Sequence, residues 1–290
     1  MMHDIETISK KNEIIILLAL ILAASPIIIT YLLLILSSFS EEMFTSLSLS
    51  SFRPTVVNWI NVFKGKTAIT GGITVNIWHY TLTTLLVALG ITGLVVLIST
   101  MAGYALSRMR FRGRKKSMIF LLLLHSFPGV SLIVGVYFMY RLTLPTNPLA
   151  LRFYSFLYVI LARGALEIPM SVWLMKGFFD SIPWEFEWSG IIDGASRIKV
   201  WKDIMVPLIK PGIMAIAIFA FLAGWGDLIY VRTFLIDPTL ATYIESNLEV
   251  EFTHLPLIAA VGTFYLLPTI IFFVLAHQLL LKTYVGGIKG

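Results

Sequence analysis

Arg163, Glu167 and Asp227 stand inside long apolar stretches of the chain, where a charged side chain is costly. In hydrocarbon each costs on the order of 2.5 to 3.5 kcal/mol on insertion scales, so such residues pair with one another or line a polar cavity. Arg163 and Glu167 are four residues apart, which places them on one face of a helix. Asp227 follows Trp225 at a similar predicted depth, near the membrane midplane. We therefore expect Arg163 and Asp227 to be able to meet.

No group of residues has the spacing of a catalytic or metal centre. The five histidines are scattered along the chain, at His3, His79, His125, His254 and His277. The sequence contains no cysteine, which excludes disulfides, thiol catalysis and cysteine-ligated metals. Gly65-Lys66-Thr67 resembles the end of a phosphate-binding loop, but Ile60 stands where the first glycine is required. We expect no catalytic residue, no metal site and no cofactor bound by this chain.

The composition is that of a membrane protein. Of the 290 residues, 58% are apolar and 13% are charged, against about 45 to 50% and about 25% in soluble domains. The net charge of +6 comes from bases beside apolar blocks, where lipid headgroups and topology explain it better than nucleic acid does. The charge-free stretch from Ile14 to Ser40 is too long for a signal peptide, so it predicts a retained first helix.

Six segments are long and apolar enough to cross a bilayer, and each must be helical because hydrocarbon offers the backbone no hydrogen-bond partners. They are Ile14–Leu36, Tyr80–Leu106, Met118–Tyr140, Phe153–Met175, Gly212–Leu235 and Leu257–Leu281. The predicted fold is therefore all-α and polytopic. We expect a single transmembrane domain over residues 1–290, with an N-terminal helix (14–36), core spans (80–281), a cytoplasmic loop (176–210) and a cytoplasmic tail (282–290).

The distribution of basic residues predicts the orientation. With the N-terminus inside, the inner segments hold 15 of the 22 Lys and Arg residues and the outer loops hold five. Cytoplasmic loops of membrane proteins carry the excess of basic residues. Both termini are therefore predicted to be cytoplasmic, in a multi-pass protein of the plasma membrane.

The long inner connection contains a short helix pattern. Ser181 has the character of a helix N-cap with Pro183 in the first turn, and Gly194 that of a helix stop. The pattern predicts an amphipathic helix on the cytoplasmic face. Its small residues Ser189 and Gly190 would let another protein approach closely. The alternative is a structural helix that packs only on its own spans.

This connection resembles the signature loop of binding-protein-dependent ABC importer permeases: Glu-Ala-Ala, three residues, Gly, nine residues, Ile, one residue, Leu-Pro. Gly194, Ile204 and Pro207 stand at the required spacings. Trp188 occupies the acidic position with Glu187 just before it, Ser189 and Gly190 replace the two alanines, and Val206 replaces the leucine. The run Asp193-Gly194-Ala195 resembles the sugar importers in particular.

Two further stretches are similar to the maltose-type second permeases. One is the basic turn Gly103-Tyr104-Ala105-Leu106-Ser107-Arg108-Met109-Arg110-Phe111-Arg112-Gly113, and the other is the glycine-rich tail Tyr284-Val285-Gly286-Gly287-Ile288-Lys289-Gly290. The resemblance thus covers the chain from about Gly103 to its end. Before that point the chain matches in topology only.

The resemblance implies a type I ABC importer permease fold and an ATP-driven sugar importer. In such a transporter this chain pairs with a second, related permease, a cytoplasmic ATPase pair holds ATP and Mg, and an external sugar-binding protein docks on the outer loops. The implied ATPase-coupling residues are Glu185, Glu187, Trp188, Ser189, Gly190, Asp193, Gly194, Ala195 and Pro207. A glucose-like monosaccharide and a maltose- or trehalose-like oligosaccharide both stay open as substrates.

Two interpretations of the intramembrane charges stay open as well. Arg163, Glu167 and Asp227 could hold sugar hydroxyls along a translocation path, with Trp225 offering a flat apolar face. Alternatively, the three charges form a buried network that only fixes helix packing.

Two other functions compete with the importer permease. A proton-coupled secondary transporter would use Glu167 and Asp227 as a proton relay, but the six spans contain no evident inverted repeat. A membrane-embedded enzyme would need a cluster of His, Asp or Glu at one membrane face, and the histidines are scattered. Transport that fails on ATP depletion but survives a protonophore would distinguish the importer from the secondary transporter.

Overall fold

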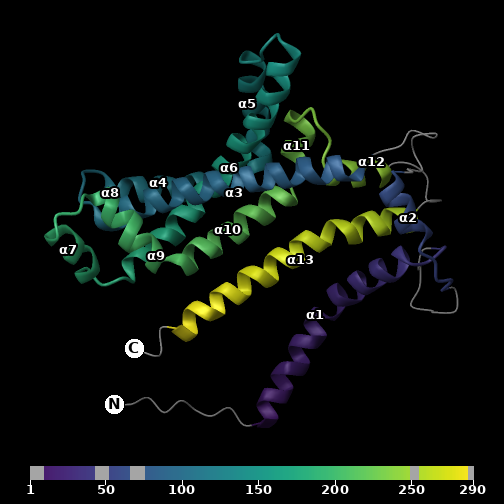
Figure 1. Ribbon diagram of the computed structural model, residues 1–290, viewed down its shortest axis with the longest axis horizontal. Helices are drawn as coiled ribbons and strands as arrows, with labels where there is room; N and C mark the ends of the chain where they lie inside the picture. Colours follow the sequence, from purple (N-terminus) through teal and green to yellow (C-terminus); the bar gives the residue numbers. More distant parts are fainter. Residues whose placement is uncertain (1–9, 43–51, 66–75, 249–254, 287–290) are drawn as a thin grey trace. The chain divides into compact units, whose positions relative to one another are not determined.

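The computed structural model describes residues 10–42, 52–65, 76–248 and 255–286, and this part of the chain is almost entirely helical (Figure 1). The β contact found within it is an isolated antiparallel bridge between Ser40 and Pro54. The all-α fold class is confirmed. The chain divides into two compact units, residues 1–75 with 247–265 and residues 76–246 with 266–290, which are described separately below. A single domain over the whole chain stays a prediction.

The first unit contains α1 (Lys10–Ser38), α2 (Val57–Lys64) and the start of α13 (Leu255–Gly286). The Asn58 side chain on α2 donates to the carbonyls of Ser38 (3.2 Å) and Ser40 (2.8 Å), so it ties α2 to the end of α1. In α2 and α13 the rings of Phe63 and Phe264 meet edge to face at 6.0 Å. No residue in the most apolar window of α1 is buried, as expected of a helix that faces lipid.

The second unit contains the longest helices and all the short ones of the inner connection. Its elements are α3 (Ile77–Arg108), α4 (Arg114–His125), α5 (Gly129–Leu142), α6 (Pro148–Asp180), α7 (Glu185–Ile192), α8 (Arg197–Val200), the π-helix η2 (Trp201–Met205), α9 (Val206–Leu208), α10 (Lys210–Trp225), α11 (Ile229–Phe234) and α12 (Leu240–Leu248). The rest of α13 belongs to this unit too. Helices α3, α6 and α10 pack lengthwise on one another, and α4 packs on α6.

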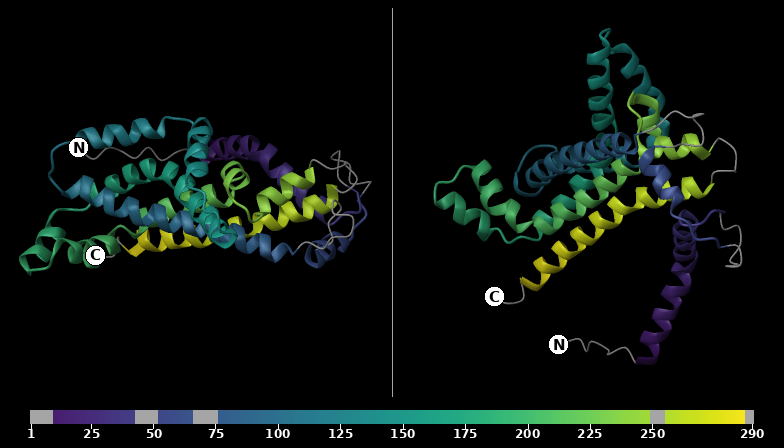
Figure 2. Two further views of the ribbon diagram at one scale, coloured as in Figure 1. Left: turned by 90° about the horizontal axis from the view of Figure 1, so that it is seen from above. Right: turned by 45° about the vertical axis from the view of Figure 1, so that its right-hand side comes forward.

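The expected spans are recovered, two of them with breaks. Within the described residues, four helices are long and apolar enough to cross a membrane, namely α1, α3, α6 and α13. Up to six spans result if each bent helix pair counts as one. The predicted third span is α4 plus α5, which meet at 96° (Figures 1 and 2). Pro128 stands at the break, where its missing N–H and its restricted neighbour prevent a continuous helix. The segment predicted as the third span is therefore two helices separated by a break at Pro128.

The predicted fifth span is also interrupted. Helix α10 ends at Trp225, and the chain resumes as α11 at Ile229. With 16 residues, α10 is shorter than the ~20 that span the hydrocarbon. On its other side α10 is reached through an 80° bend after Leu208. The break between α10 and α11 lies where the predicted intramembrane charge Asp227 stands.

Helices α3 and α6 approach one another closely at positions without a side chain. A Cβ on Gly103 would lie 2.7 Å from the Cβ of Met175 and 3.0 Å from the backbone N of Lys176. A Cβ on Gly90 would lie 2.4 Å from the Cδ1 of Ile160. Small residues at such contacts are what allows membrane helices to approach closely. The α3–α6 contact therefore depends on these glycines.

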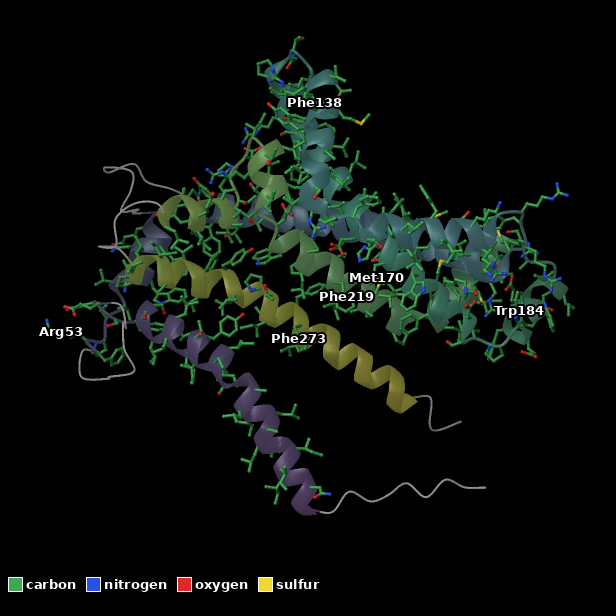
Figure 3. The ribbon with its side chains drawn as sticks, turned by 180° about the vertical axis from the view of Figure 1, so that it is seen from behind. Arg53, Phe138, Met170, Trp184, Phe219 and Phe273 are labelled. Carbon is green, nitrogen blue, oxygen red and sulfur yellow. The ribbon has the colours of Figure 1, made fainter. Side chains whose placement is uncertain are left out.

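Many large apolar side chains of the second unit point outward. Phe138 on α5 and Phe219 on α10 are examples: both side chains are more than half exposed, and both are labelled in Figure 3. A surface of this kind is costly in water but not against lipid or a partner helix. The exposed apolar surface thus agrees with the predicted membrane location.

We predict that Gly103→Ala destabilises the protein, because the new Cβ would meet the Met175 side chain and the α6 backbone. Overpacking of this kind costs roughly 1 to 3 kcal/mol. The matched control is Gly93→Ala on the same helix, where a Cβ would find no described atom within 4 Å and helix propensity improves. Thermal unfolding of the purified complex should show a lower midpoint for Gly103→Ala alone. Equal midpoints for the two variants would contradict the close contact.

Candidate functional site

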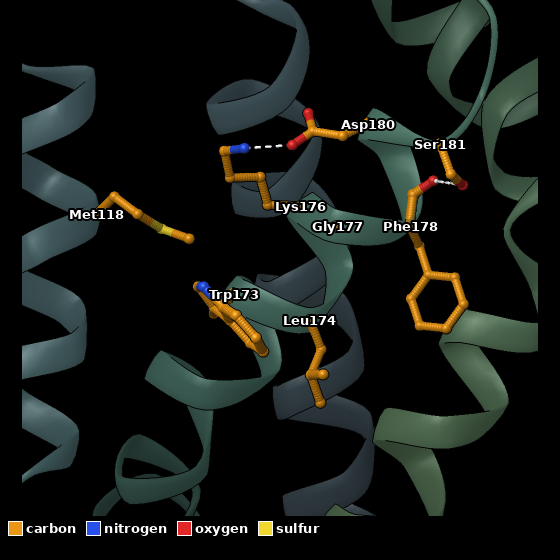
Figure 4. A pocket seen from close by; sticks show the side chains of 8 residues that line it. All are labelled: Met118, Trp173, Leu174, Lys176, Gly177, Phe178, Asp180 and Ser181. Carbon is orange, nitrogen blue, oxygen red and sulfur yellow. Dashed lines mark hydrogen bonds and ion pairs between the residues drawn. The ribbon is translucent and has the colours of Figure 1, made fainter.

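The predicted amphipathic helix of the inner connection exists as α7, but it starts later than expected. Ser181 does not cap it; instead Ser181 closes α6, and its hydroxyl donates to the Phe178 carbonyl at 2.8 Å (Figure 4). Helix α7 begins at Glu185 without a side-chain cap. The sequence pattern of Ser181 and Pro183 therefore marks the end of one helix rather than the start of the next.

The predicted stop at Gly194 is confirmed in detail. Gly194 has φ +81°, a left-handed conformation that favours glycine. Its N–H donates to the Ile191 carbonyl at 3.0 Å, and the N–H of Ala195 donates to the Gly190 carbonyl at 3.0 Å. These two bonds form a Schellman motif, which satisfies the last carbonyls of α7. The helix thus ends at a defined point with its backbone closed.

Helix α7 has an inner and an outer face. Glu187 and Gly190 are buried against the chain itself, and Glu187 is 1% exposed. Trp188 (53%) and Ile192 (84%) are exposed, as are Glu185, Ser189 and Asp193. A Cβ on Gly190 would lie 2.5 Å from Ile204 Cδ1. Gly190 therefore makes room for its own chain, and the expectation that it admits another protein's surface is wrong.

Glu187 is the charged residue of α7 that faces the helix bundle. The hydroxyl of Tyr104 on α3 donates to Glu187 Oε1 at 2.9 Å. Arg197 Nη1 lies 3.4 Å from the same oxygen, and Arg108 Nε lies 3.7 Å from Glu187 Oε2. Glu187 was expected to couple to an ATPase, but its carboxylate is turned inward and is engaged by α3 and α8.

The segment after α7 owes its irregular shape to Pro207. The chain forms a π-helix over Trp201–Met205, in which the Val206 N–H reaches the Trp201 carbonyl. Pro207 has no N–H to offer the ladder, so a regular α-helical pattern is interrupted there. Ala195 is half-buried and Pro207 is exposed. The predicted coupling residues thus lie in the segment from α7 to α9.

An open cavity of about 530 Å³ lies between α4 and the end of α6. Met118 on α4 and Trp173 on α6 face each other across it, and the ion pair of Lys176 and Asp180 lies at its edge (Figure 4). Asp180 also accepts a hydrogen bond from the Ser107 hydroxyl at 2.6 Å. The hydrogen bond between Ser107 and Asp180 therefore ties the end of α6 to the end of α3.

The three intramembrane charges meet as predicted. Arg163 Nη1 donates to Glu167 Oε1 at 2.7 Å, and Arg163 Nε donates to Asp227 Oδ2 at 2.9 Å. The other oxygen of Asp227 accepts from the backbone N–H groups of Tyr230 (2.9 Å) and Val231 (3.1 Å). Asp227 thus supplies the acceptors that the first amides of α11 lack at the helix break.

A cavity of about 330 Å³ opens beside these charges. Arg163, Glu167 and Asp227 line it together with His125 and Tyr230. Its volume falls in the lower range of small-molecule sites, which hold about 300 to 1,000 Å³. Trp225 is not among its lining residues; it is 2% exposed and its ring stacks on Phe221 at 5.7 Å. The arrangement brings the three charges together but leaves Trp225 apart from them.

The opposite end of the second unit carries its own ion pairs. Asp237 pairs with Arg152 at the start of α6 and lies 3.8 Å from His79 Nε2 at the start of α3. Arg232 pairs with Glu245 on α12. Burial raises the pKa of Tyr243 on α12 to about 12, which keeps its hydroxyl protonated. Glu249 and Glu251, which follow α12, lie outside the described residues.

A family model for the inner membrane component of binding-protein-dependent transport systems matches residues 95–284. The chain belongs to this family. Its members are inner membrane components of transport systems that depend on a binding protein, so the expectation of a multi-pass transport permease is confirmed.

Curated relatives and a solved structure agree with the family. The permease is 36% identical over 212 residues to the maltodextrin transport system permease protein MdxG of Bacillus subtilis, covering 71% of this chain and 74% of that protein. It is 30% identical over 202 residues to the trehalose/maltose transport system permease protein MalG of Thermococcus litoralis, covering 69% and 67%. Its fold is similar to a chain of a bacterial ABC transporter involved in the import of the acidic polysaccharide alginate, with a TM-score of 0.68, 16% identity, and coverage of 93% and 98%.

Sequence reasoning missed the partners of Glu187 in the permease. Tyr104 and Arg108 were noted as parts of a basic turn without a role. Tyr104 stands 83 residues before Glu187, so no local pattern joins them. The available signal was chemical: a carboxylate on the inward face of a short helix requires a buried donor or cation.

We predict different effects for the two carboxylates of the intramembrane cluster. Asp227→Ala leaves Arg163 partly unpaired and removes the cap of α11, so it should lower stability by about 3 kcal/mol. Asp227→Asn keeps an acceptor for the α11 amides and should lose less. Glu167→Gln is the comparison variant at the cavity, because the Glu167 side chain is 23% exposed and contacts no α11 amide. Thermal unfolding of the purified transporter tests this order, and it is wrong if Glu167→Gln is the least stable.

Proposed function

We propose that this permease is one half of the membrane channel of an ATP-driven carbohydrate importer. The observation that carries the proposal is α7, a helix closed at its C-terminus by a Schellman motif, which turns Glu187 inward and exposes Trp188 and Ile192. A separate protein can bind such a helix without deforming it. The named substrates of the two relatives, maltodextrin and trehalose/maltose, support a carbohydrate as the solute.

The proposed mechanism is the transmission of a movement across α7. ATP and Mg are held by a partner ATPase pair, whose closure displaces the docked helix. Because α7 is bonded to α3 and α8, its displacement would tilt the long helices of the second unit. The cavity beside Arg163 would then open alternately to the two sides of the membrane, as in other two-state switches of packed elements.

The other half of the channel is proposed to come from a second, related permease. A single chain with the exposed apolar surface described above can be covered by lipid and by another helical subunit. An external sugar-binding protein would dock at the end that carries α12, where charged groups such as Arg152 and Asp237 gather. These partners are the ones that the resemblance implied.

The cavity beside Arg163 is the proposed place where this subunit touches the sugar. Glu167 makes one contact and Arg163 makes two, and both keep further acceptor or donor positions for the cavity that they line. Asp227 is already engaged by Arg163 and two amides, so we assign it mainly to holding α11. A role for Trp225 would require movement of α10 or its neighbours, because its ring is buried here.

We predict that solute uptake by the complete transporter in proteoliposomes requires ATP inside and is unaffected by a protonophore. The complex is co-purified from native membranes so that the second permease, the ATPase and the binding protein come with it. Maltose, trehalose, maltodextrin and glucose are compared as radiolabelled solutes. Uptake that stops with the protonophore would favour the proton-coupled transporter, and uptake by this chain alone would contradict the proposal.

We predict that Gly194→Asp uncouples ATP hydrolysis from transport. A residue other than glycine at φ +81° is strained by roughly 1 to 2 kcal/mol, and a second carboxylate beside Asp193 would oppose the helix C-terminus. Both effects disturb the end of α7. The ATP hydrolysed per solute imported should rise.

The control for that variant is Gly113→Asp. Gly113 also has positive φ, at +92°, and a Cβ there would meet no described atom within 4 Å, but it lies in the turn before α4. It carries the same strain and charge away from α7. If Gly194→Asp keeps the wild-type ratio of ATP hydrolysed to solute imported, or if both variants raise that ratio equally, coupling does not depend on the end of α7.

A further inference from the structure

The guanidinium of Arg108 is buried at the end of α3, where a charge must be compensated. Its Nη2 lies 2.5 Å from the carbonyl of Phe179 and 2.5 Å from the carbonyl of Ile182. The first is among the last carbonyls of α6, which lack partners within their own helix. A cation at a helix C-terminus also meets the negative end of the helix dipole. Arg108 therefore holds the end of α6 to the end of α3.

The same guanidinium also reaches α7. Its Nε lies 3.7 Å from Glu187 Oε2, and its Cζ lies 4.4 Å from the centre of the Trp184 ring. Within the described part of the chain, Arg108 Nε and Glu187 Oε2 are both buried without a hydrogen-bond partner. Each of these two atoms thus has the other's charge as its main compensation. Removing the charge of Arg108 would leave the buried Glu187 with Arg197, 3.4 Å from its other oxygen, as its remaining cation.

Tyr104 makes the contact two-sided. It stands one turn before Arg108 on α3, so both side chains lie on the same face. Its hydroxyl donates to the other oxygen of Glu187 at 2.9 Å. Both oxygens of Glu187 are therefore met by residues of α3, and the orientation of α7 about its own axis is fixed by two contacts rather than one.

We propose that Arg108, together with Tyr104, is a positioning residue that sets the orientation of α7 through the buried carboxylate of Glu187. One guanidinium contacts the ends of α3, α6 and α7, so a displacement of α7 reaches both long helices at the same point. This inference rests on the proposed function of α7 as the docking site of the partner ATPase. It gives Glu187 a different task from the one expected: it faces its own chain and not the ATPase.

The test uses the complete transporter in proteoliposomes or nanodiscs, with two readouts. Hydrogen exchange measured by mass spectrometry on the peptide 185–194 reports whether α7 stays ordered. The ratio of ATP hydrolysed to solute imported reports coupling, which a purely structural contact elsewhere would not change. Glu187→Gln keeps the shape and a Tyr104 acceptor while it removes the charge. We expect faster exchange in α7 and a ratio raised by roughly threefold or more.

The matched controls remove one charge from exposed positions near the same site. Asp203→Asn neutralises an exposed carboxylate in η2, and Arg110→Gln neutralises an exposed cation two residues after Arg108. Both should keep the wild-type exchange of α7 and the wild-type ratio. Arg108→Gln should raise the ratio of ATP hydrolysed to solute imported as Glu187→Gln does. If Arg110→Gln raises this ratio equally, the effect belongs to the basic turn in general and the inference is overturned.

The double variant Arg108→Gln/Glu187→Gln decides the matter if a single variant fails to assemble. Because it removes both charges, it should recover part of the assembly and of the α7 protection lost in Glu187→Gln. A double variant no better than the single one would show that the charges do not compensate each other. Unchanged exchange in Glu187→Gln while the wild type imports solute with ATP would overturn this inference alone, whereas a wild type that does not use ATP would overturn the proposed function.

Discussion

The close packing of α3 against α6 is the constraint on which the rest of the second unit depends. In a bilayer, apolar side chains gain little by exchanging lipid for one another, so helix pairing rests on van der Waals contact and on interhelical hydrogen bonds. Gly90 and Gly103 allow the contact, and polar residues at the helix ends supply the bonds. Arg108 and Ser107 join the two helices at the inner end, and Asp237 lies against the start of both at the outer end. The α3–α6 pair therefore positions the polar contacts at both of its ends.

The intramembrane charges follow from a broken helix. Where α10 stops and α11 begins, backbone amides lose their partners in surroundings without water. Asp227 satisfies two of them, and its carboxylate in turn requires a cation, which Arg163 provides. Arg163 has donors to spare and also binds Glu167. The packing network and the polar cavity are thus one arrangement, because Arg163, Glu167 and Asp227 both fix the break and line the cavity.

The sequence was sufficient for the spans and for one contact of the candidate site. Long apolar runs identify membrane helices because length and hydrophobicity alone decide insertion, and the spacing of Arg163 and Glu167 is a property of a single helix. The 96° bend at Pro128 was not predictable in size, since a proline interrupts a helix but neighbouring helices set the angle. Ser181 suits either a helix start or a helix end by type, and tertiary context chose the end. The partners of Glu187 required knowledge of which helices lie side by side.

The departure of Trp188 from the family pattern has a physical explanation in the two faces of α7. Successive residues of a helix are turned by about 100°, so a carboxylate at position 187 and one at position 188 face different surroundings. Glu187 meets Arg108 and Tyr104, while Trp188 lies on the exposed face with its ring 6.2 Å from that of Trp184. The carboxylate thus stands at position 187, where it faces the buried cation Arg108. A register shift of one residue would bury the indole against Arg108 and leave the carboxylate outside, so the aromatic outer face and the charged inner face are set together.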